Sequence, residues 1–149
     1  MTDNNLKNAG KKAIDSSTNY EYDVFVVDDN FDQANIIKLL IEQSGLKANF
    51  TTDSEAAYQT IIKDKPRLVI LDLMMPELDG LKLLKMIKEN PDTQNVKIIV
   101  YSGKLYDSDR RKAFMLGADI FLTKPTRSQV LMDSIRSLLD SNRNEIYQN

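Results

Sequence analysis

The chain has 149 residues, of which 42% are hydrophobic and 28% are charged, a composition that predicts one globular domain with a core of ordinary size. Its net charge of −2 gives no electrostatic reason to expect a nucleic-acid partner, and no apolar run reaches the ~18 residues that a membrane span needs. The chain contains no cysteine and no histidine, which excludes disulfides, histidine general bases and zinc sites built from these residues. We therefore expect a cytoplasmic protein whose chemistry uses carboxylates, hydroxyls, lysine or groups brought by a partner.

The N-terminal segment, residues 1–20, lacks apolar periodicity, and we expect it to be a flexible polar extension. After it, short apolar runs that predict strands alternate with segments whose apolar residues recur at helical spacing. We place the domain at residues 21–141 and a polar tail at residues 142–149. In chain order the predicted elements are a strand at 24–27, a helix at 32–44, a strand at 47–51, a helix at 54–64, a strand at 68–71, a helix at 80–89, a strand at 96–100, a helix at 107–116, a strand at 120–122 and a helix that begins at Thr126.

This alternation indicates a parallel sheet with helices on both faces, because right-handed crossovers of this length join parallel strands. The alternating pattern of residues 47–51 is typical of an exposed edge strand, whereas the other four strands have the continuous apolar pattern of buried ones. The sequence therefore predicts a flavodoxin-like (βα)5 doubly wound α/β fold with strand order 2-1-3-4-5. We expect Ser54 to cap the second helix, Asp79 to be a turn or helix-start residue, and Thr126 with Gln129 to form a capping box.

Polar residues follow four of the predicted strands. Asp28 and Asp29 come after the first strand, Asp72 after the third, Ser102 after the fourth and Lys124 after the fifth. Because ligands bind at the carboxyl ends of the strands in such sheets, we expect these side chains to meet at one rim. Adjacent carboxylates repel one another, and Mg²⁺ (or Mn²⁺), which prefers oxygen ligands, would relieve that repulsion. Ser102 and Lys124 would donate to phosphoryl oxygens, and Asp72 is the best candidate for a nucleophile that forms an aspartyl phosphate.

Four short motifs stand at these strand ends: Asp28-Asp29, Leu71-Asp-Leu-Met-Met-Pro-Glu-Leu-Asp-Gly80, Tyr101-Ser-Gly103 and Leu122-Thr-Lys-Pro125. They resemble the motifs of response-regulator receiver domains, the phosphoacceptor domains of two-component signalling and phosphorelays. The resemblance extends from about Tyr22 to Asp140. Each motif alone is weak, but the four together, in this order and at these strand ends, are specific.

The resemblance implies a role for each carboxylate. Asp72 would accept a phosphoryl group from the phosphohistidine of a sensor histidine kinase or of a histidine phosphotransfer protein. Asp29, Asp72 and the backbone carbonyl of Met74 would bind Mg²⁺ directly, whereas Asp28 would act mainly through a bound water. Such a chain would not be an enzyme in the ordinary sense, since it assists only its own phosphorylation and dephosphorylation.

The resemblance also implies a conformational switch. Lys124 would pair with the phosphoryl group and be held by a cis peptide before Pro125. Ser102 would move to hydrogen-bond a phosphoryl oxygen, and Phe121 would turn inward when it does, with Tyr101 covering the same region. The face formed by the fourth helix, the fifth strand and the fifth helix would then change for a downstream target protein.

The assembly of the protein is predicted from two features. Ile120 stands where many family members carry an acidic residue, close to a region that forms dimer salt bridges in some of them, so we expect a monomer or a weak dimer. The chain ends soon after the last helix, which predicts a stand-alone receiver. A fragment of a larger regulator is the alternative.

Other functions fit parts of the sequence. A phosphatase of the haloacid-dehalogenase type also uses a magnesium-bound aspartate nucleophile, but it carries a second aspartate where this chain has Met74. A flavodoxin would need a phosphate-binding loop where the acidic pair stands. A receiver-like scaffold that is never phosphorylated would not need the complete acidic set. Taken singly, Asp28 fits a helix cap equally well, and Phe121 an ordinary core residue.

Overall fold

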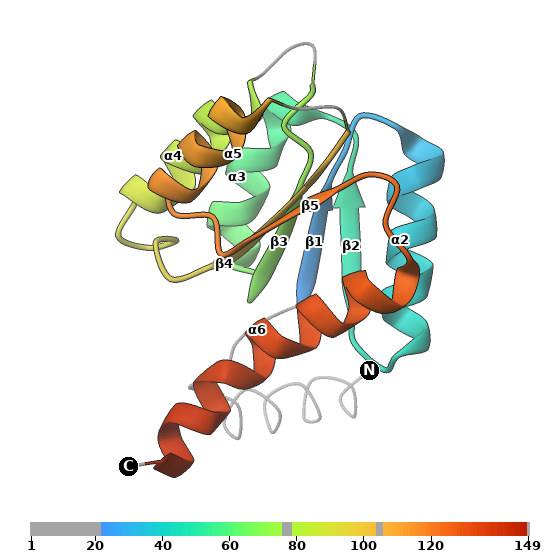
Figure 1. Ribbon diagram of the computed structural model, residues 1–149, viewed down its shortest axis with the longest axis vertical. Coiled ribbons are helices and arrows are strands. Elements are labelled where there is room, and N and C mark those ends of the chain that lie inside the picture. The colour runs from blue at the N-terminus through green and yellow to red at the C-terminus, as the bar shows by residue number, and fades with distance from the viewer. Residues whose placement is uncertain (1–21, 76–78, 104–105, 149) are drawn as a thin grey trace, which may run out of the picture.

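The predicted strands pair into one parallel sheet in the computed structural model, which describes residues 22–75, 79–103 and 106–148, with side chains up to residue 140. The strand order is β2-β1-β3-β4-β5 (Figure 1), which confirms the predicted flavodoxin-like fold. The extension predicted for residues 1–20 lies outside the described residues. The strands are β1 (Val24–Val27), β2 (Ala48–Thr51), β3 (Leu68–Leu71), β4 (Lys97–Ser102) and β5 (Ile120–Thr123).

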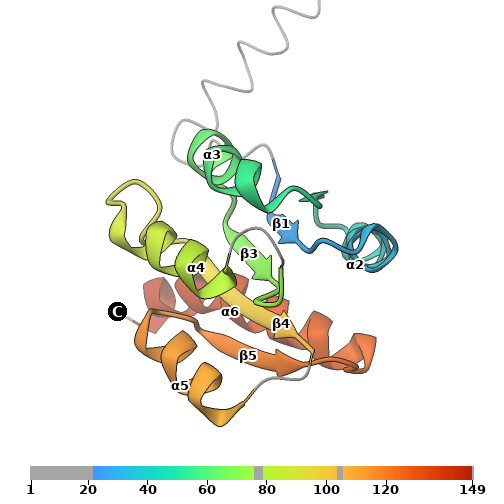
Figure 2. The ribbon, with the colours of Figure 1, turned by 90° about the horizontal axis from the view of Figure 1, so that it is seen from above.

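The described helices cover both faces of this sheet (Figures 1 and 2). They are α2 (Phe31–Gln43), α3 (Ser54–Asp64), α4 (Gly80–Glu89), α5 (Asp107–Met115) and α6 (Ser128–Gln148). Val24 and Val26 belong to the core under α2 and α6, whereas Phe25 and Val27 belong to the core under α3, α4 and α5. Successive side chains of a strand point to opposite faces, which explains why β1 is apolar at every position.

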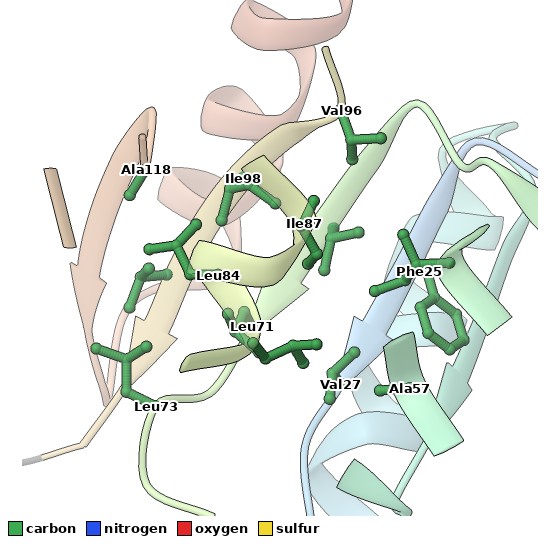
Figure 3. Close-up of a cluster of buried hydrophobic side chains, with 14 of the residues drawn as sticks. Phe25, Val27, Ala57, Leu71, Leu73, Leu84, Ile87, Val96, Ile98 and Ala118 are labelled. Atoms are coloured by element: carbon green, nitrogen blue, oxygen red, sulfur yellow. The ribbon is translucent and has the colours of Figure 1, made fainter. Parts of the chain in front are cut away.

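The core under α3 and α4 sets the position of the two central strands. Figure 3 shows Phe25 of β1, Leu71 of β3 and Ile98 of β4 against Ala57 of α3 and Leu84 of α4. All five side chains are buried, and each large one stabilises the fold by about 1.5–3 kcal/mol relative to an exposed side chain. This packing holds β1 and β3 side by side, so that their carboxyl ends coincide.

Strand β5 is less buried than its continuous apolar pattern predicted, although the predicted strand order already placed it at an edge. Ile120, Phe121 and Leu122 are half-buried, and Thr123 is exposed. The reason is its place at the end of the strand order, where it pairs with β4 alone. A short apolar run such as that of β5 therefore does not distinguish a half-buried edge strand from a buried central strand.

Two of the three predicted helix starts are different in the structure. Asp53, and not Ser54, caps α3, because its side chain accepts from the backbone N–H groups of Glu55 and Ala56. Asp79 does cap α4, as expected. The capping box at Thr126 is wrong, since the Thr126 hydroxyl donates to the Thr123 carbonyl at 2.6 Å and α6 begins two residues later.

The helix α6 also extends further than the sequence suggested. Its backbone is helical to Gln148, so most of the predicted tail at residues 142–149 continues the helix. We placed the domain boundary at residue 141 because residues 142–149 are mostly polar, but a polar segment can also continue a helix.

A glycine brings the loop after β3 against the start of α4. A Cβ atom placed on Gly80 would lie 2.4 Å from Leu73 Cα and 2.8 Å from the backbone oxygen of Asp72. No side chain fits in that space without moving the backbone. The close approach therefore holds Asp72 and Leu73 against the start of α4.

Candidate functional site

The three aspartates lie together at the carboxyl end of the two central strands. β1 and β3 pair up to Val27 and Leu71, and the Asp72 N–H donates to the Val27 carbonyl at 3.0 Å, which places Asp72 beside Asp28. One carboxylate oxygen from each of Asp28, Asp29 and Asp72 lies within 4.8 Å of the other two. Asp28 and Asp72 are buried, with 2% and 7% of their surface exposed, whereas Asp29 is open to solvent.

The side chain of Lys124 reaches this cluster from the loop after β5. Its Nζ lies 2.6 Å from Asp28 Oδ2, 3.3 Å from Asp72 Oδ2 and 2.7 Å from Gln33 Oε1. The Lys124–Pro125 peptide is cis, which confirms the form that the family resemblance implied. Lys124 therefore contacts the ends of β1 and β3, neither of which is next to β5 in the sheet.

The hydroxyl of Ser102 contacts Asp72 from the other side. Ser102 is fully buried at the end of β4 and donates to Asp72 Oδ1 at 2.5 Å, and the Leu73 N–H donates to Ser102 Oγ at 3.3 Å. The Met74 N–H also donates to Asp72 Oδ1, at 2.9 Å. The Lys124 N–H donates to the Ser102 carbonyl at 2.7 Å, so the backbones of the two donor residues are joined. The carboxylate of Asp72 is thus held by donors on both of its oxygens.

Burial and charge shift two of the pKa values. Burial raises the pKa of the Asp28 carboxyl, although hydrogen bonds from Lys124 and from the Asn30 N–H act against the rise. Burial alone would lower the pKa of Lys124, but its hydrogen bond to Asp28 and its attraction to Asp72 and Asp28 outweigh burial and raise it. The two pKa values rise for different reasons. The Asp28 carboxyl is buried beside a second carboxylate, and the Lys124 ammonium faces two carboxylates. Lys124 therefore stays positively charged at neutral pH.

The donor set of the cluster fits a hard divalent cation. It consists of carboxylate oxygens, of which those of Asp29 are open to solvent, and the chain contains no cysteine or histidine that could add a thiolate or imidazole ligand. Mg²⁺ prefers such ligands and keeps some of its waters, which suits a site with one exposed side. Such an acidic cluster is typical of the magnesium site of a receiver domain.

The two aromatic residues that we expected to cover one region lie on opposite faces of the sheet. Phe121 packs against the core under α4 and α5, with the Arg110 guanidinium 5.0 Å and the Phe114 ring 6.3 Å from its ring centroid. Tyr101 belongs to the other core, and its ring centroid lies 5.4 Å from Lys124 Nζ. Tyr101 therefore contacts the site lysine, and Phe121 contacts α5.

Sequence reasoning did not identify Gln33 as a site residue. Gln33 lies in the first turn of α2, where the Asn30 side chain accepts from its backbone N–H at 3.0 Å. The Asn30 N–H in turn donates to Asp28 Oδ1 at 2.9 Å. A polar residue in the first turn after the acidic pair was the only available signal, because the partner, Lys124, lies 91 residues away in the sequence.

Comparisons with known proteins identify the class of this protein. Residues 24–136 match the family described as the response regulator receiver domain. The chain therefore belongs to this family, whose members are signalling phosphoacceptors of two-component systems rather than true enzymes.

Individual relatives are distant. The chain is 29% identical over 116 residues to the uncharacterized transcriptional regulatory protein YclJ of Bacillus subtilis, a match that covers 78% of this chain and 50% of YclJ. It is 28% identical over 105 residues to an uncharacterized 14.6 kDa protein of Leptolyngbya boryana, covering 70% of this chain and 80% of that protein. The chain thus spans about half the length of YclJ and most of the second relative.

A solved structure has the same fold. The signal receiver domain of a DNA-binding response regulator from Colwellia psychrerythraea superposes with a TM-score of 0.75 at 26% identity, covering 80% of this chain and 99% of that one. Among the described helices, none has the length and apolar character needed to cross a bilayer.

Proposed function

We propose that Asp72 accepts a phosphoryl group from the phosphohistidine of a sensor histidine kinase or of a histidine phosphotransfer protein, with Mg²⁺ bound beside it. The observation that carries this proposal is the place of the Asp72 carboxylate, between the Ser102 hydroxyl and the Lys124 ammonium and within 4.8 Å of the oxygens of Asp28 and Asp29. Membership of the receiver family supports the proposal, because a receiver domain implies a histidine kinase as its partner.

The transfer uses the groups around Asp72 in separate roles. A carboxylate oxygen of Asp72 attacks phosphorus, the phosphorus–nitrogen bond breaks, and its electron pair stays on the departing imidazole nitrogen. Lys124 and Ser102 donate to the phosphoryl oxygens, on which charge accumulates. Asp29, Asp72 and the Met74 carbonyl would hold Mg²⁺, with Asp28 acting through a water, and the bound cation would further neutralise the charge on the phosphoryl group.

The phosphorylated form would present a different face to a downstream target protein. In this proposal Ser102 leaves Asp72 for a phosphoryl oxygen, and Phe121 turns inward. The contacts of Phe121 with Arg110 and Phe114 support the idea, because any movement of this ring must alter how α5 is held. The affected face consists of α5, β5 and α6. Converting a mostly inactive population into a mostly active one needs ~5.5 kcal/mol of differential stabilisation.

The proposal is tested with acetyl phosphate and Mg²⁺, followed by intact-protein mass spectrometry. The wild-type chain should gain one phosphoryl group, and Asp72→Asn should gain none while its unfolding transition shows that it still folds. Stoichiometric labelling of Asp72→Asn would refute the role of Asp72. Sustained turnover of a phosphate ester would instead favour the phosphatase alternative, and absence of labelling in the wild type would favour the scaffold.

A further inference from the structure

The ammonium group of Lys124 has three acceptors, and Gln33 is the one without charge. The distances from Nζ are 2.6 Å to Asp28, 2.7 Å to Gln33 and 3.3 Å to Asp72. A lysine ammonium has three protons to donate, so these acceptors use its full capacity. In the structure Lys124 is therefore closer to Asp28 and Gln33 than to the proposed phosphoacceptor.

A phosphoryl group on Asp72 would compete with these acceptors. Its oxygens carry negative charge and lie beyond the carboxylate, so Lys124 can donate to them only by giving up a present partner. The carboxylates of Asp28 and Asp72 add ion-pair attraction to their hydrogen bonds with the ammonium, whereas the amide of Gln33 carries no charge, which makes Gln33 the weakest of the three partners. Gln33 is also on the exposed surface of α2, where water can replace the lysine at little cost.

The backbone of Gln33 is anchored, so that only its side chain is free to change partner. The Asn30 side chain accepts from the Gln33 N–H, and the Asn30 N–H donates to Asp28. The start of α2 is thus tied to the same carboxylate that binds Lys124. A change at Gln33 consists of rotation of one side chain and does not require the helix to move.

We propose that Gln33 is a positioning residue that holds Lys124 in the unphosphorylated protein and releases it when Asp72 is phosphorylated, an inference that rests on the proposed function. Because the Gln33 hydrogen bond is present before phosphoryl transfer and absent afterwards, it slows phosphorylation. It does not affect the lifetime of the phosphorylated protein, since Lys124 has already left Gln33 in that state.

The test compares Gln33→Leu and Gln33→Glu with the wild type, and uses Gln43→Leu and Gln43→Glu, at the other end of α2, as matched controls. The full chain is incubated with acetyl phosphate and Mg²⁺, labelling is followed by mass spectrometry, and the loss of label is followed after the donor is removed. Gln33→Leu should be labelled about two- to tenfold faster, the effect of removing one hydrogen bond of ordinary strength. Gln33→Glu should be labelled more slowly, because a carboxylate holds Lys124 more strongly. Both Gln43 variants should behave as the wild type, and the rate of label loss from Gln33→Leu should equal that of the wild type.

Opposite effects of the two Gln33 variants distinguish positioning from a merely structural role, which would slow labelling in both. Unchanged or slower labelling of Gln33→Leu would overturn the inference, as would an equal acceleration of label loss. A wild-type chain that acquires no label would refute the proposed function and this inference with it. A labelled wild type with an unresponsive Gln33→Leu would refute the inference alone.

Discussion

Replacing Gly80 by alanine tests whether the loop that begins with Asp72 is fixed by its contact with α4. The new Cβ would lie 2.4 Å from Leu73 Cα and 2.8 Å from the Asp72 backbone oxygen. Carbon atoms normally approach to about 3.5 Å, so the overlap is roughly 1 Å, and both atoms that it meets belong to the backbone. Either the loop or the start of α4 must therefore move.

The magnitude follows from two opposing effects. Overpacking of this kind typically costs about 1–3 kcal/mol, whereas alanine gains up to ~1 kcal/mol over glycine in a helix. For a chain of this size, each kcal/mol lowers the melting temperature by roughly 2–4 °C. Displacement of Asp72 by a fraction of the overlap should slow phosphorylation at least about tenfold, since a misplacement of ~1 Å can cost about 10²-fold in a reaction rate.

The measurements are thermal unfolding and the rate of labelling by acetyl phosphate with Mg²⁺. Gly103→Ala is the matched control, because a Cβ at Gly103 meets nothing within 4 Å. That control should melt at the wild-type temperature or slightly above it, because alanine lowers the entropy of the unfolded chain. If Gly80→Ala were as stable as Gly103→Ala and were labelled at the wild-type rate, the contact would not position the loop.

Two further predictions concern charge. Lys88 donates to the carbonyls of Gln94 and Val96 at 3.1 and 2.7 Å, and burial lowers its pKa below the ordinary 10.5. At Lys88 the unfolded chain therefore binds more protons than the folded one as the pH rises toward 10.5, so the contribution of Lys88 to stability should rise with pH in that window. Lys88→Met should remove that rise and cost about 1–3 kcal/mol of stability at neutral pH, because it leaves two carbonyls without a donor. Urea unfolding at several pH values measures the pH slope and the loss of stability. An unchanged pH slope in Lys88→Met would contradict the lowered pKa of Lys88. Mg²⁺ at a hundred times its Kd should raise the free energy of unfolding by about 2.7 kcal/mol. Asp29→Asn should weaken this effect, and EDTA should reverse it. A wild-type melting temperature that does not change when Mg²⁺ is added would argue against the cation site.

Much of the site was predictable because it depends on few elements. Asp28, Asp72, Ser102 and Lys124 each follow a short apolar strand, and parallel strands place their carboxyl ends on one rim. Once the alternation of strands and helices was recognised, the convergence of these side chains followed from topology alone. Their chemical roles do not follow from topology, because they depend on the phosphoryl group and the cation that these side chains bind.

The features that sequence reasoning missed depend on competition between near-equal choices. Asp53 and Ser54 are adjacent and both are good caps, so only the path of the chain decides which one binds the helix N–H groups. Thr126 has the spacing of a capping box, but the turn after the cis peptide offers its hydroxyl the Thr123 carbonyl instead. Gln33 and Lys124 meet because α2 lies beside the loop that follows β5. No local pattern in the sequence encodes this long-range contact.

The backbone hydrogen bond from Lys124 to Ser102 has a consequence for how this surface can diversify. Ser102 and Lys124, the two donors on either side of Asp72, are held by the pairing of β4 with β5. Ser102 stands opposite Thr123 in that pairing, and the next N–H along the chain, that of Lys124, donates to the Ser102 carbonyl. Their separation is therefore set by the pairing of β4 with β5 and not by the segment that connects these two strands, which includes α5. Insertions, deletions and substitutions in that segment can reshape the outer surface for new binding partners while the chemistry at the rim keeps its geometry.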